Sequence, residues 1–277
     1  MDFRMRPSRV LKKLRNGEVV NSFKLNLADI RATQIAAGFG FDCIWTCMEH
    51  VPNDLATVEA QIAAAKGYNV DVMCRVKRGS YSDYILPLEL DAAGIMVPHV
   101  MGVEDAREVI RMCRFQPIGR RAADGGNADA AFCNVDFKDY VRQANRERFI
   151  ILQIEDPEAL DEMDAICELE GFDVLLFGPG DFSHAIGHPG KMDHPLVQET
   201  RERVAKIARK HGKFAGAVGT PENRQELIDM GYQFLNMGAD VVGLSNYCRE
   251  VAAGCGIQTP NRLAGYYESE KTSGESE

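Results

Sequence analysis

Two apolar runs of the sequence each end in a carboxylate. The run LQIED (152–156) places Glu155 at its end, and the run LLFGPGDFS (175–183) does the same with Asp181. Short, continuous runs of Leu, Ile, Phe and Val are typical of strands that are buried on both faces. A carboxylate at the end of such a strand is costly unless a positive charge meets it. The pair could hold a hard divalent cation; alternatively, one carboxylate caps a helix and the other forms a salt bridge.

Other polar side chains also follow apolar runs. Gln153 and Glu155 are two residues apart, as are Arg75 and Lys77, so each pair points the same way from an extended strand. His50 stands at the end of a further run. Two carboxylates, a histidine, an arginine and a glutamine at one edge of a sheet fit a small anionic substrate that is bound through a metal.

Each of these side chains has a structural alternative. Lys77 could form a Schiff base with a keto acid, but the polar stretch RVKRGS (75–80) does not suit the desolvated position that this chemistry needs. Arg75 could be only an ion-pair partner. Gly178 and Gly180 could simply make a tight turn, although glycines also let a ligand approach the backbone. For the remaining histidines we expect structural or exposed positions: His99, His184, His188, His194 and His211.

Strand and helix patterns alternate along the chain. Strands are expected at the eight apolar runs 19–27, 41–50, 71–79, 94–100, 149–156, 172–182, 213–219 and 233–240. Amphipathic patterns such as 103–115 lie between them and predict helices. Eight βα units predict a TIM (β/α)8 barrel, in which active sites lie where the strands end. The competing fold, an open doubly wound sheet, usually has a glycine-rich turn after its first strand, and KLNLAD (24–29) has no glycine.

The domain organisation follows from the same patterns. We expect a single barrel domain over 1–258, preceded within it by a short helix that packs through Val10, Leu11 and Leu14, and a polar tail over 259–277. The longest irregular stretch is 116–134, and loops of this length in compact domains tend to be functional or mobile.

Composition limits the possible partners and location. The chain has 277 residues, 45% of them hydrophobic, which is enough for a large core, and its net charge of −9 disfavours nucleic acid as a partner. No run of about 18 apolar residues indicates a membrane span, and the basic start lacks the apolar region of a secretory signal. No CxxC pair suggests zinc. Free buried thiols in the reducing cytoplasm are expected for the eight cysteines 43, 47, 74, 113, 133, 167, 248 and 255.

Together, these strand ends resemble the HpcH/HpaI aldolase family, the metal-dependent class II pyruvate aldolases that act on 4-hydroxy-2-oxo acids. The resemblance covers roughly residues 8–255, and the joint occurrence of EH, LQIE and GPGD is its specific part. The matching pieces are GFDCIWTCMEH (40–50), MCRV (73–76), AAGIMVPHV (92–100), FQPIGRR (115–121), LQIE (152–155), FDVLLFGPGDFS (172–183), GHPG with HP (187–195) and GK (212–213).

The resemblance implies a role for each matched residue. Glu155 and Asp181 would bind Mg²⁺, Mn²⁺ or Co²⁺, and the same ion would take the carboxylate and keto oxygens of pyruvate. Arg75 would lie against the keto oxygen and stabilise the charge of the enolate left when C3–C4 breaks. His50 would be the acid/base that takes the 4-hydroxyl proton. The substrate carboxylate would be held by Gln153, Gly178, Pro179 and Gly180.

Two positions depart from the pattern of the family. The acidic residue that pairs with the family's histidine corresponds to Glu89, where Asp is more usual. Cys47 stands two residues before Glu49, where the family commonly has Asp, and this bears on the aldehyde partner and the protonation scheme. The resemblance also implies a homo-oligomer, namely a homohexamer, and the apolar residues of the last helix support that expectation: Val241, Val242, Leu244 and Val251.

Three alternatives remain open. A lyase of the citryl- or malyl-CoA type and an enzyme like phosphoenolpyruvate mutase share the barrel and the metal carboxylates. The CoA lyase would need a basic surface for the nucleotide, and only RRAADGG (120–126) offers one. A non-catalytic barrel that binds a keto acid is the alternative outside enzymes, and Cys47 is the feature that favours it.

Overall fold

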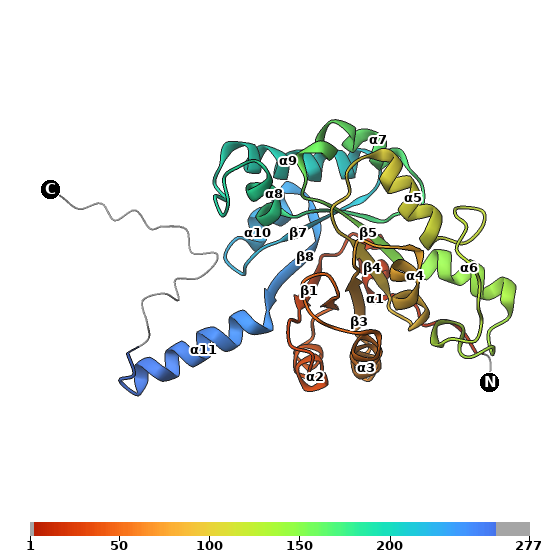
Figure 1. Ribbon diagram of the computed structural model, residues 1–277, viewed down its shortest axis with the longest axis horizontal. Coiled ribbons are helices and arrows are strands. Elements are labelled where there is room, and N and C mark those ends of the chain that lie inside the picture. Colours follow the sequence, from red (N-terminus) through yellow and green to blue (C-terminus); the bar gives the residue numbers. More distant parts are fainter. Residues whose placement is uncertain (1–2, 259–277) are drawn as a thin grey trace.

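The computed structural model describes residues 3–258, and these residues form a closed barrel of eight parallel strands in the order of the sequence (Figure 1). The strands are β1 (Val20–Lys24), β2 (Cys43–Cys47), β3 (Asp71–Arg75), β4 (Gly94–Val97), β5 (Phe149–Ile154), β6 (Val174–Phe177), β7 (Phe214–Val218) and β8 (Tyr232–Ala239). The predicted TIM barrel is thereby confirmed, whereas the predicted tail at 259–277 lies outside the described residues.

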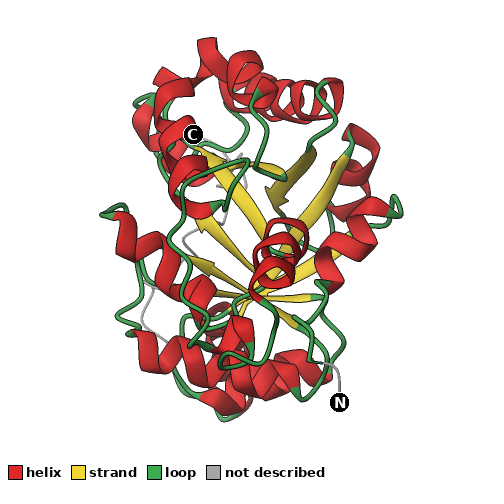
Figure 2. Cartoon of the chain, turned by 90° about the vertical axis from the view of Figure 1, so that its right-hand side faces the viewer, coloured by secondary structure: helices red, strands yellow, loops and turns green. Residues whose placement is uncertain are grey.

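Helices surround the barrel, as the red ribbons around the yellow strands show in Figure 2. The α-helices are α1 (Arg9–Arg15), α2 (Ile30–Gly38), α3 (Leu55–Lys66), α4 (Tyr81–Glu89), α5 (Val103–Cys113), α6 (Phe137–Glu147), α7 (Met163–Glu168), α8 (Pro179–Ala185), α9 (Pro195–Lys210), α10 (Arg224–Met230) and α11 (Asp240–Gly254). Two 3-10 helices, η1 (Ala128–Ala130) and η2 (Pro157–Glu162), complete the set. Within the stretch expected to be irregular, 116–134, only η1 is regular structure.

The strand residues alternate between two hydrophobic layers. Inward-facing side chains such as Trp45, Met73 and Leu176 pack inside the barrel, and their sequence neighbours such as Ile44, Val72 and Leu175 pack against the helices. This alternation is the period of two that an extended strand imposes. It also decides which side chains at the strand ends turn inward.

Several strands are shorter than the apolar runs suggest. β2 ends at Cys47 and β4 ends at Val97, so Glu49, His50 and His99 belong to the loops that follow. All eight cysteines are free, but Cys133, Cys248 and Cys255 are exposed rather than buried. No helix among the described residues combines the length and the apolar character that crossing a membrane requires.

Helix α1 closes the amino-terminal end of the barrel. As predicted, Val10, Leu11 and Leu14 are buried, and they join the inner layer of side chains. The helix is also fixed by Asp71, whose fully buried carboxylate accepts hydrogen bonds from Ser8 Oγ at 2.7 Å and from the backbone N–H of Val10 at 3.0 Å. An ion pair from Arg6 at 2.6 Å compensates the charge.

Helix α11 differs from the other long helices, because none of its residues is buried. Figure 1 shows it projecting away from the barrel after β8. Its start is held by Asp240, whose carboxylate accepts the backbone N–H groups of Asn26 at 2.8 Å and Leu27 at 2.9 Å.

Replacing Asp71 by Ala should reduce the free energy of unfolding by about 3 kcal/mol, because removal of one partner leaves buried donors and a cation uncompensated. Urea unfolding followed by circular dichroism measures this change. Asp161→Ala is the matched control, since Asp161 is exposed and its loss should change stability by less than about 0.5 kcal/mol. Equal stabilities of the two variants would contradict the assigned role of Asp71.

Candidate active site

Polar side chains gather where the strands end, at the mouth of the barrel. The alternation that buries Trp45 inside also turns Cys47 inward from β2, and it does the same for Arg75 at the end of β3. In β5 it turns Gln153 inward, with Glu155 immediately after the strand. This is the face on which TIM-barrel enzymes carry their active sites.

Glu155 is the most buried carboxylate of the mouth, with 1% of its surface exposed. Its Oε1 accepts the backbone N–H of His99 at 2.9 Å, and its Oε2 accepts a hydrogen bond from Nε2 of Gln153. Burial raises the pKa of Glu155 to about 7; the His99 hydrogen bond and ring oppose this rise, and the charge of Asp181 adds to it. The positive groups of the protein near Glu155 therefore do not offset the cost of burying its negative charge.

His99 completes a compact cluster around this carboxylate. Its Nδ1 contacts Asp156 Oδ2 at 2.8 Å, and its Nε2 lies 3.5 Å from Glu49 Oε1 and 3.8 Å from Glu155 Oε1. One possible ligand atom from each of Glu49, His99 and Glu155 lies within 4.8 Å of the other two. A histidine that is oriented by a carboxylate through one ring nitrogen is the usual arrangement of a metal-binding imidazole.

The position of His99 depends on an unusual backbone conformation. Its φ of 51° lies in the left-handed region, which is uncommon for residues other than glycine. Burial by itself would lower the pKa of His99, but the hydrogen bond to Asp156 and the charges of Glu155 and Glu49 raise it overall. We expected a structural or exposed position for His99, and the structure places its ring among the carboxylates of the mouth.

Arg75 is buried beside this cluster. Its Nε lies 2.9 Å from Glu49 Oε2, and both Nε and Nη2 lie 3.4 Å from the sulfur of Cys47. The guanidinium also lies 5.1 Å from the centroid of the Trp45 ring. These contacts on several sides hold Arg75 in one orientation at the mouth. Arg75 was predicted as a site residue from the sequence, whereas its partner Glu49 was not.

The predicted glycine-rich turn follows β6. A Cβ on Gly178 would lie 2.5 Å from Glu155 Oε2, so only glycine allows this close approach to the carboxylate. Pro179 and Gly180 form the first turn of α8, which also contains Asp181. Asp181 is exposed, and its charge contributes to the raised pKa of Glu155. It does not belong to the cluster of possible ligands formed by Glu49, His99 and Glu155.

Two predicted catalytic residues lie apart. His50 is exposed at the mouth, with its Nε2 3.5 Å from Glu49 Oε2. Glu89 ends α4, at the opposite end of the barrel, where it accepts a hydrogen bond from Asn127 at 3.3 Å and lies 3.9 Å from Arg121. Within the described residues of one chain, Glu89 and His50 therefore do not form the pair that the resemblance implies.

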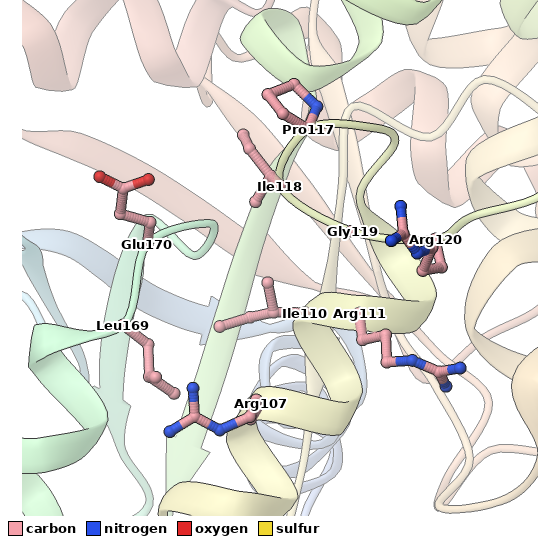
Figure 3. Close-up of a pocket in the computed structure, with 9 residues that line it drawn as sticks. All are labelled: Arg107, Ile110, Arg111, Pro117, Ile118, Gly119, Arg120, Leu169 and Glu170. Carbon is pink, nitrogen blue, oxygen red and sulfur yellow. The ribbon is translucent and has the colours of Figure 1, made fainter.

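A cavity of about 500 Å³ lies away from the mouth (Figure 3). Its lining includes Arg107 and Arg111 of α5, Arg120, and the residues just before β6, so it sits at the amino-terminal ends of the strands. Arg120, the first residue of the basic stretch considered for a nucleotide, lines this cavity and so lies away from the mouth. Lys77 is exposed and unsuited to a Schiff base.

Comparison with known proteins gives consistent matches. The model of the family "HpcH/HpaI aldolase/citrate lyase" matches residues 23–247. A hydroxypyruvate/pyruvate aldolase from Pseudomonas aeruginosa is 32% identical over 246 residues, which cover 88% of this chain and 91% of that protein. A 2-keto-3-deoxy-L-rhamnonate aldolase from Klebsiella pneumoniae is 32% identical over 83% of this chain and 86% of that one.

A solved structure gives the same result. The crystal structure of an HpcH/HpaI aldolase from Desulfitobacterium hafniense superposes with a TM-score of 0.85 at 28% identity, and the match covers 91% of this chain and 98% of that chain. The family match extends from β1 into α11 and includes every residue of the mouth described above. The resemblance seen in the sequence is therefore confirmed, and the chain belongs to the HpcH/HpaI aldolase/citrate lyase family.

Proposed function

We propose that this protein is a divalent-metal-dependent aldolase that cleaves a 4-hydroxy-2-oxo acid reversibly to pyruvate and an aldehyde. The observation that carries the proposal is the buried Glu155 carboxylate, grouped with His99, Glu49 and Arg75 at the mouth of the barrel. Relatives named hydroxypyruvate/pyruvate aldolase and 2-keto-3-deoxy-L-rhamnonate aldolase support this carbon–carbon lyase activity.

The residues at the mouth fit a divalent cation. Glu155 and Asp181 would hold it, with His99 Nε2 as a further possible donor. A second sign of fit is the buried Oε1 of Gln153, which has no hydrogen-bond partner among the described residues. Oxygen donors suit Mg²⁺ and Mn²⁺, and an imidazole nitrogen favours a later transition metal such as Co²⁺. When bound, the cation would polarise the keto group of the substrate as a Lewis acid.

Arg75 would stabilise the charge that develops on the keto oxygen. Its guanidinium is already fixed by Glu49 and Cys47, so little reorganisation is needed as the C3–C4 bond breaks. Gln153 and the backbone at Gly178, Pro179 and Gly180 would hold the carboxylate of the pyruvate moiety.

His50 would take the proton of the 4-hydroxyl group. Its exposed ring beside Glu49 is in a position to exchange that proton with solvent. We retain Glu89 as its acidic partner, and because Glu89 lies at the other end of the barrel, this pair requires a second copy of the chain.

We infer that the protein is a homo-oligomer, with a homohexamer as the specific proposal. Helix α11 exposes Val242, Leu244 and Tyr247, and it leaves the barrel without packing on it. Ile35 of helix α2 and Phe39, directly after that helix, are also exposed. We propose that these two apolar surfaces are covered by contacts between copies of the chain.

The location proposed for this protein is the cytoplasm. All eight cysteines are free, including the three that are exposed. Free exposed thiols persist in a reducing compartment and tend to oxidise outside it. The partners we expect are a keto acid and an aldehyde, with no nucleic acid and no membrane.

Removal of the metal should abolish pyruvate formation from a 4-hydroxy-2-oxo acid, and added Mn²⁺ should restore it, because the cation would supply the Lewis acid that polarises the keto group. A lactate dehydrogenase coupled assay with and without chelator measures this. Borohydride added with pyruvate should not inactivate the enzyme, and a reduced adduct on any lysine would contradict the metal mechanism.

A binding control separates the metal site from overall damage. His99→Leu should weaken Mn²⁺ binding by about 10- to 100-fold in calorimetry. His184→Leu removes an exposed histidine of α8 and should leave the affinity unchanged.

Arg75→Ala should lower kcat by about 100- to 1000-fold, because the charge that Arg75 meets is complete only after the bond breaks. Arg75→Lys should recover part of the rate, since it keeps the charge but loses the planar fork. Steady-state kinetics on the folded variants measures both effects. Arg78→Ala removes an exposed arginine and should retain kcat. A well-folded Arg75→Ala protein with near-normal kcat would remove Arg75 from the catalytic residues.

Light scattering at micromolar concentration should give the mass of an oligomer. Leu244→Glu in α11 should shift this mass towards the monomer, since a charge cannot be buried in an apolar interface. Ile118→Glu, at the cavity of Figure 3, is the control and should keep the oligomer. A wild-type monomer would refute the proposed assembly.

A further inference from the structure

The carboxylate of Glu49 is carried by a loop rather than by a strand. Residues 48–53, here called the Glu49 loop, lie between the end of β2 and the residue that caps α3. From this loop Glu49 reaches Arg75 with one oxygen at 2.9 Å and His99 with the other at 3.5 Å. Because Glu49 lies two residues beyond β2, the hydrogen bonds between strands do not by themselves fix these contacts.

The side-chain amide of Asn53 closes the Glu49 loop at its base. Its Nδ2 donates a hydrogen bond to the backbone carbonyl of Cys47, the last residue of β2, at 3.0 Å. The same nitrogen lies 3.3 Å from Thr46 Oγ1 and donates to it. One amide thus joins the end of the loop to the end of the strand, across the residues that carry Glu49.

A second amide holds this closure from helix α3. Because Cys47 and Trp45 point into the barrel, Thr46 between them points outwards, where its hydroxyl donates to Oε1 of Gln61 in α3 at 2.5 Å. Asn53 is 4% exposed, and Thr46 and Gln61 are fully buried. Hydrogen bonds that are shielded from water in this way are stronger than exposed ones.

The rest of the Glu49 loop is held as well. The backbone N–H of Met48 donates to the carbonyl of Arg75 at 2.8 Å, and the N–H of Asn53 donates to the carbonyl of Val51 at 2.7 Å. The side chain of Val51 is buried with the inner layer of the barrel. Contacts at both ends and in the middle therefore leave the loop one arrangement, and the amide of Asn53 completes it.

The two amides are not an efficient way to stabilise the fold. Oδ1 of Asn53 and Nε2 of Gln61 are buried and have no hydrogen-bond partner among the described residues. A buried polar atom without a partner destabilises the folded state, and apolar side chains of the same shape would avoid that cost. What the amides provide is therefore the geometry of the loop rather than stability.

We propose that Asn53 is a positioning residue of the active site, which holds the Glu49 loop so that the carboxylate of Glu49 meets both Arg75 and His99. Its effect on the reaction rests on the proposed function, in which Arg75 and His99 have their roles. A displacement of about 1 Å at such a site can lower the rate on the order of 100-fold.

Hydrogen exchange tests the hold on the loop without any assay of activity. Asn53→Leu keeps the approximate shape and removes the donor, so the amides of the Glu49 loop should exchange on the order of tenfold faster in mass spectrometry of the full chain. Asn145→Leu is the matched control, since the Asn145 amide also donates to two backbone carbonyls, those of Phe115 and Gln116, at the other end of the barrel. It should leave exchange in the Glu49 loop unchanged.

Thr46→Val gives a second variant in case Asn53→Leu does not fold. It removes only the hydroxyl that joins the two amides, so exchange in the Glu49 loop should rise by a smaller factor. Unchanged exchange of this loop in both variants, or in Thr46→Val alone if Asn53→Leu is unfolded, would overturn the proposal.

Kinetics shows whether the position of Glu49 matters to the reaction. In saturating Mn²⁺, Asn53→Leu should lower kcat by about 10- to 100-fold with little change in KM, whereas Asn145→Leu should retain kcat. In a Glu49→Ala background Asn53→Leu should cost less than about threefold more, because no carboxylate is left to position. Equal losses in the two backgrounds, or a near-normal kcat of Asn53→Leu, would overturn the positioning role.

The proposed aldolase activity is tested separately. Faster exchange of the Glu49 loop in Asn53→Leu, with no pyruvate formation by the wild-type protein from any 4-hydroxy-2-oxo acid, would contradict the reaction and support the hold of Asn53 on the loop. Pyruvate formation that Asn53→Leu leaves unchanged would contradict the positioning role alone.

Discussion

Burying a carboxylate at the end of a barrel strand is the constraint on which the site depends. Glu155 cannot reach water, so its oxygen atoms must be met by donors from the protein or by a cation. One donor is the backbone N–H of His99, which is available only because His99 adopts a left-handed conformation. Another is the side-chain amide of Gln153, and the absence of a side chain at Gly178 leaves space for this amide and for the carboxylate. Residues that belong to or follow β4, β5 and β6 thus surround one carboxyl group.

A second layer of the mouth depends on Glu49. This carboxylate contacts the Arg75 guanidinium with one oxygen and the imidazole of His99 with the other. It therefore connects the residue proposed to stabilise the enolate with a residue proposed to bind the cation. Cys47 adds its sulfur to the same guanidinium. Cys47 stands where the resemblance implies an Asp, and Glu49 is the carboxylate that pairs with Arg75 in this structure.

The sequence predicted the barrel well because its signal is local. Apolar runs at regular spacing are enough to count the strands, and a period of two is enough to turn Gln153 and Arg75 inward. It predicted less where contacts depend on loop geometry: Glu49 and His99 lie beyond the observed strand ends, and the left-handed φ of His99 has no pattern in the sequence. The pair expected between His50 and Glu89 came from resemblance alone, and no local rule could place it. The apolar residues of α11 were evident in the sequence, but that they stay uncovered within one chain was not.

Trp45, whose ring lies near the cationic groups of both Lys24 and Arg75, is the only tryptophan of the protein. An indole changes its dipole when it absorbs light, and its emission therefore responds to nearby charges and to water. Trp45 is buried between strands whose ends form the mouth, so the fluorescence of this one residue originates at the site and nowhere else in the chain. A ligand that neutralises either cation changes the field across the ring. The fold has thus placed an intrinsic optical reporter within reach of its own substrate.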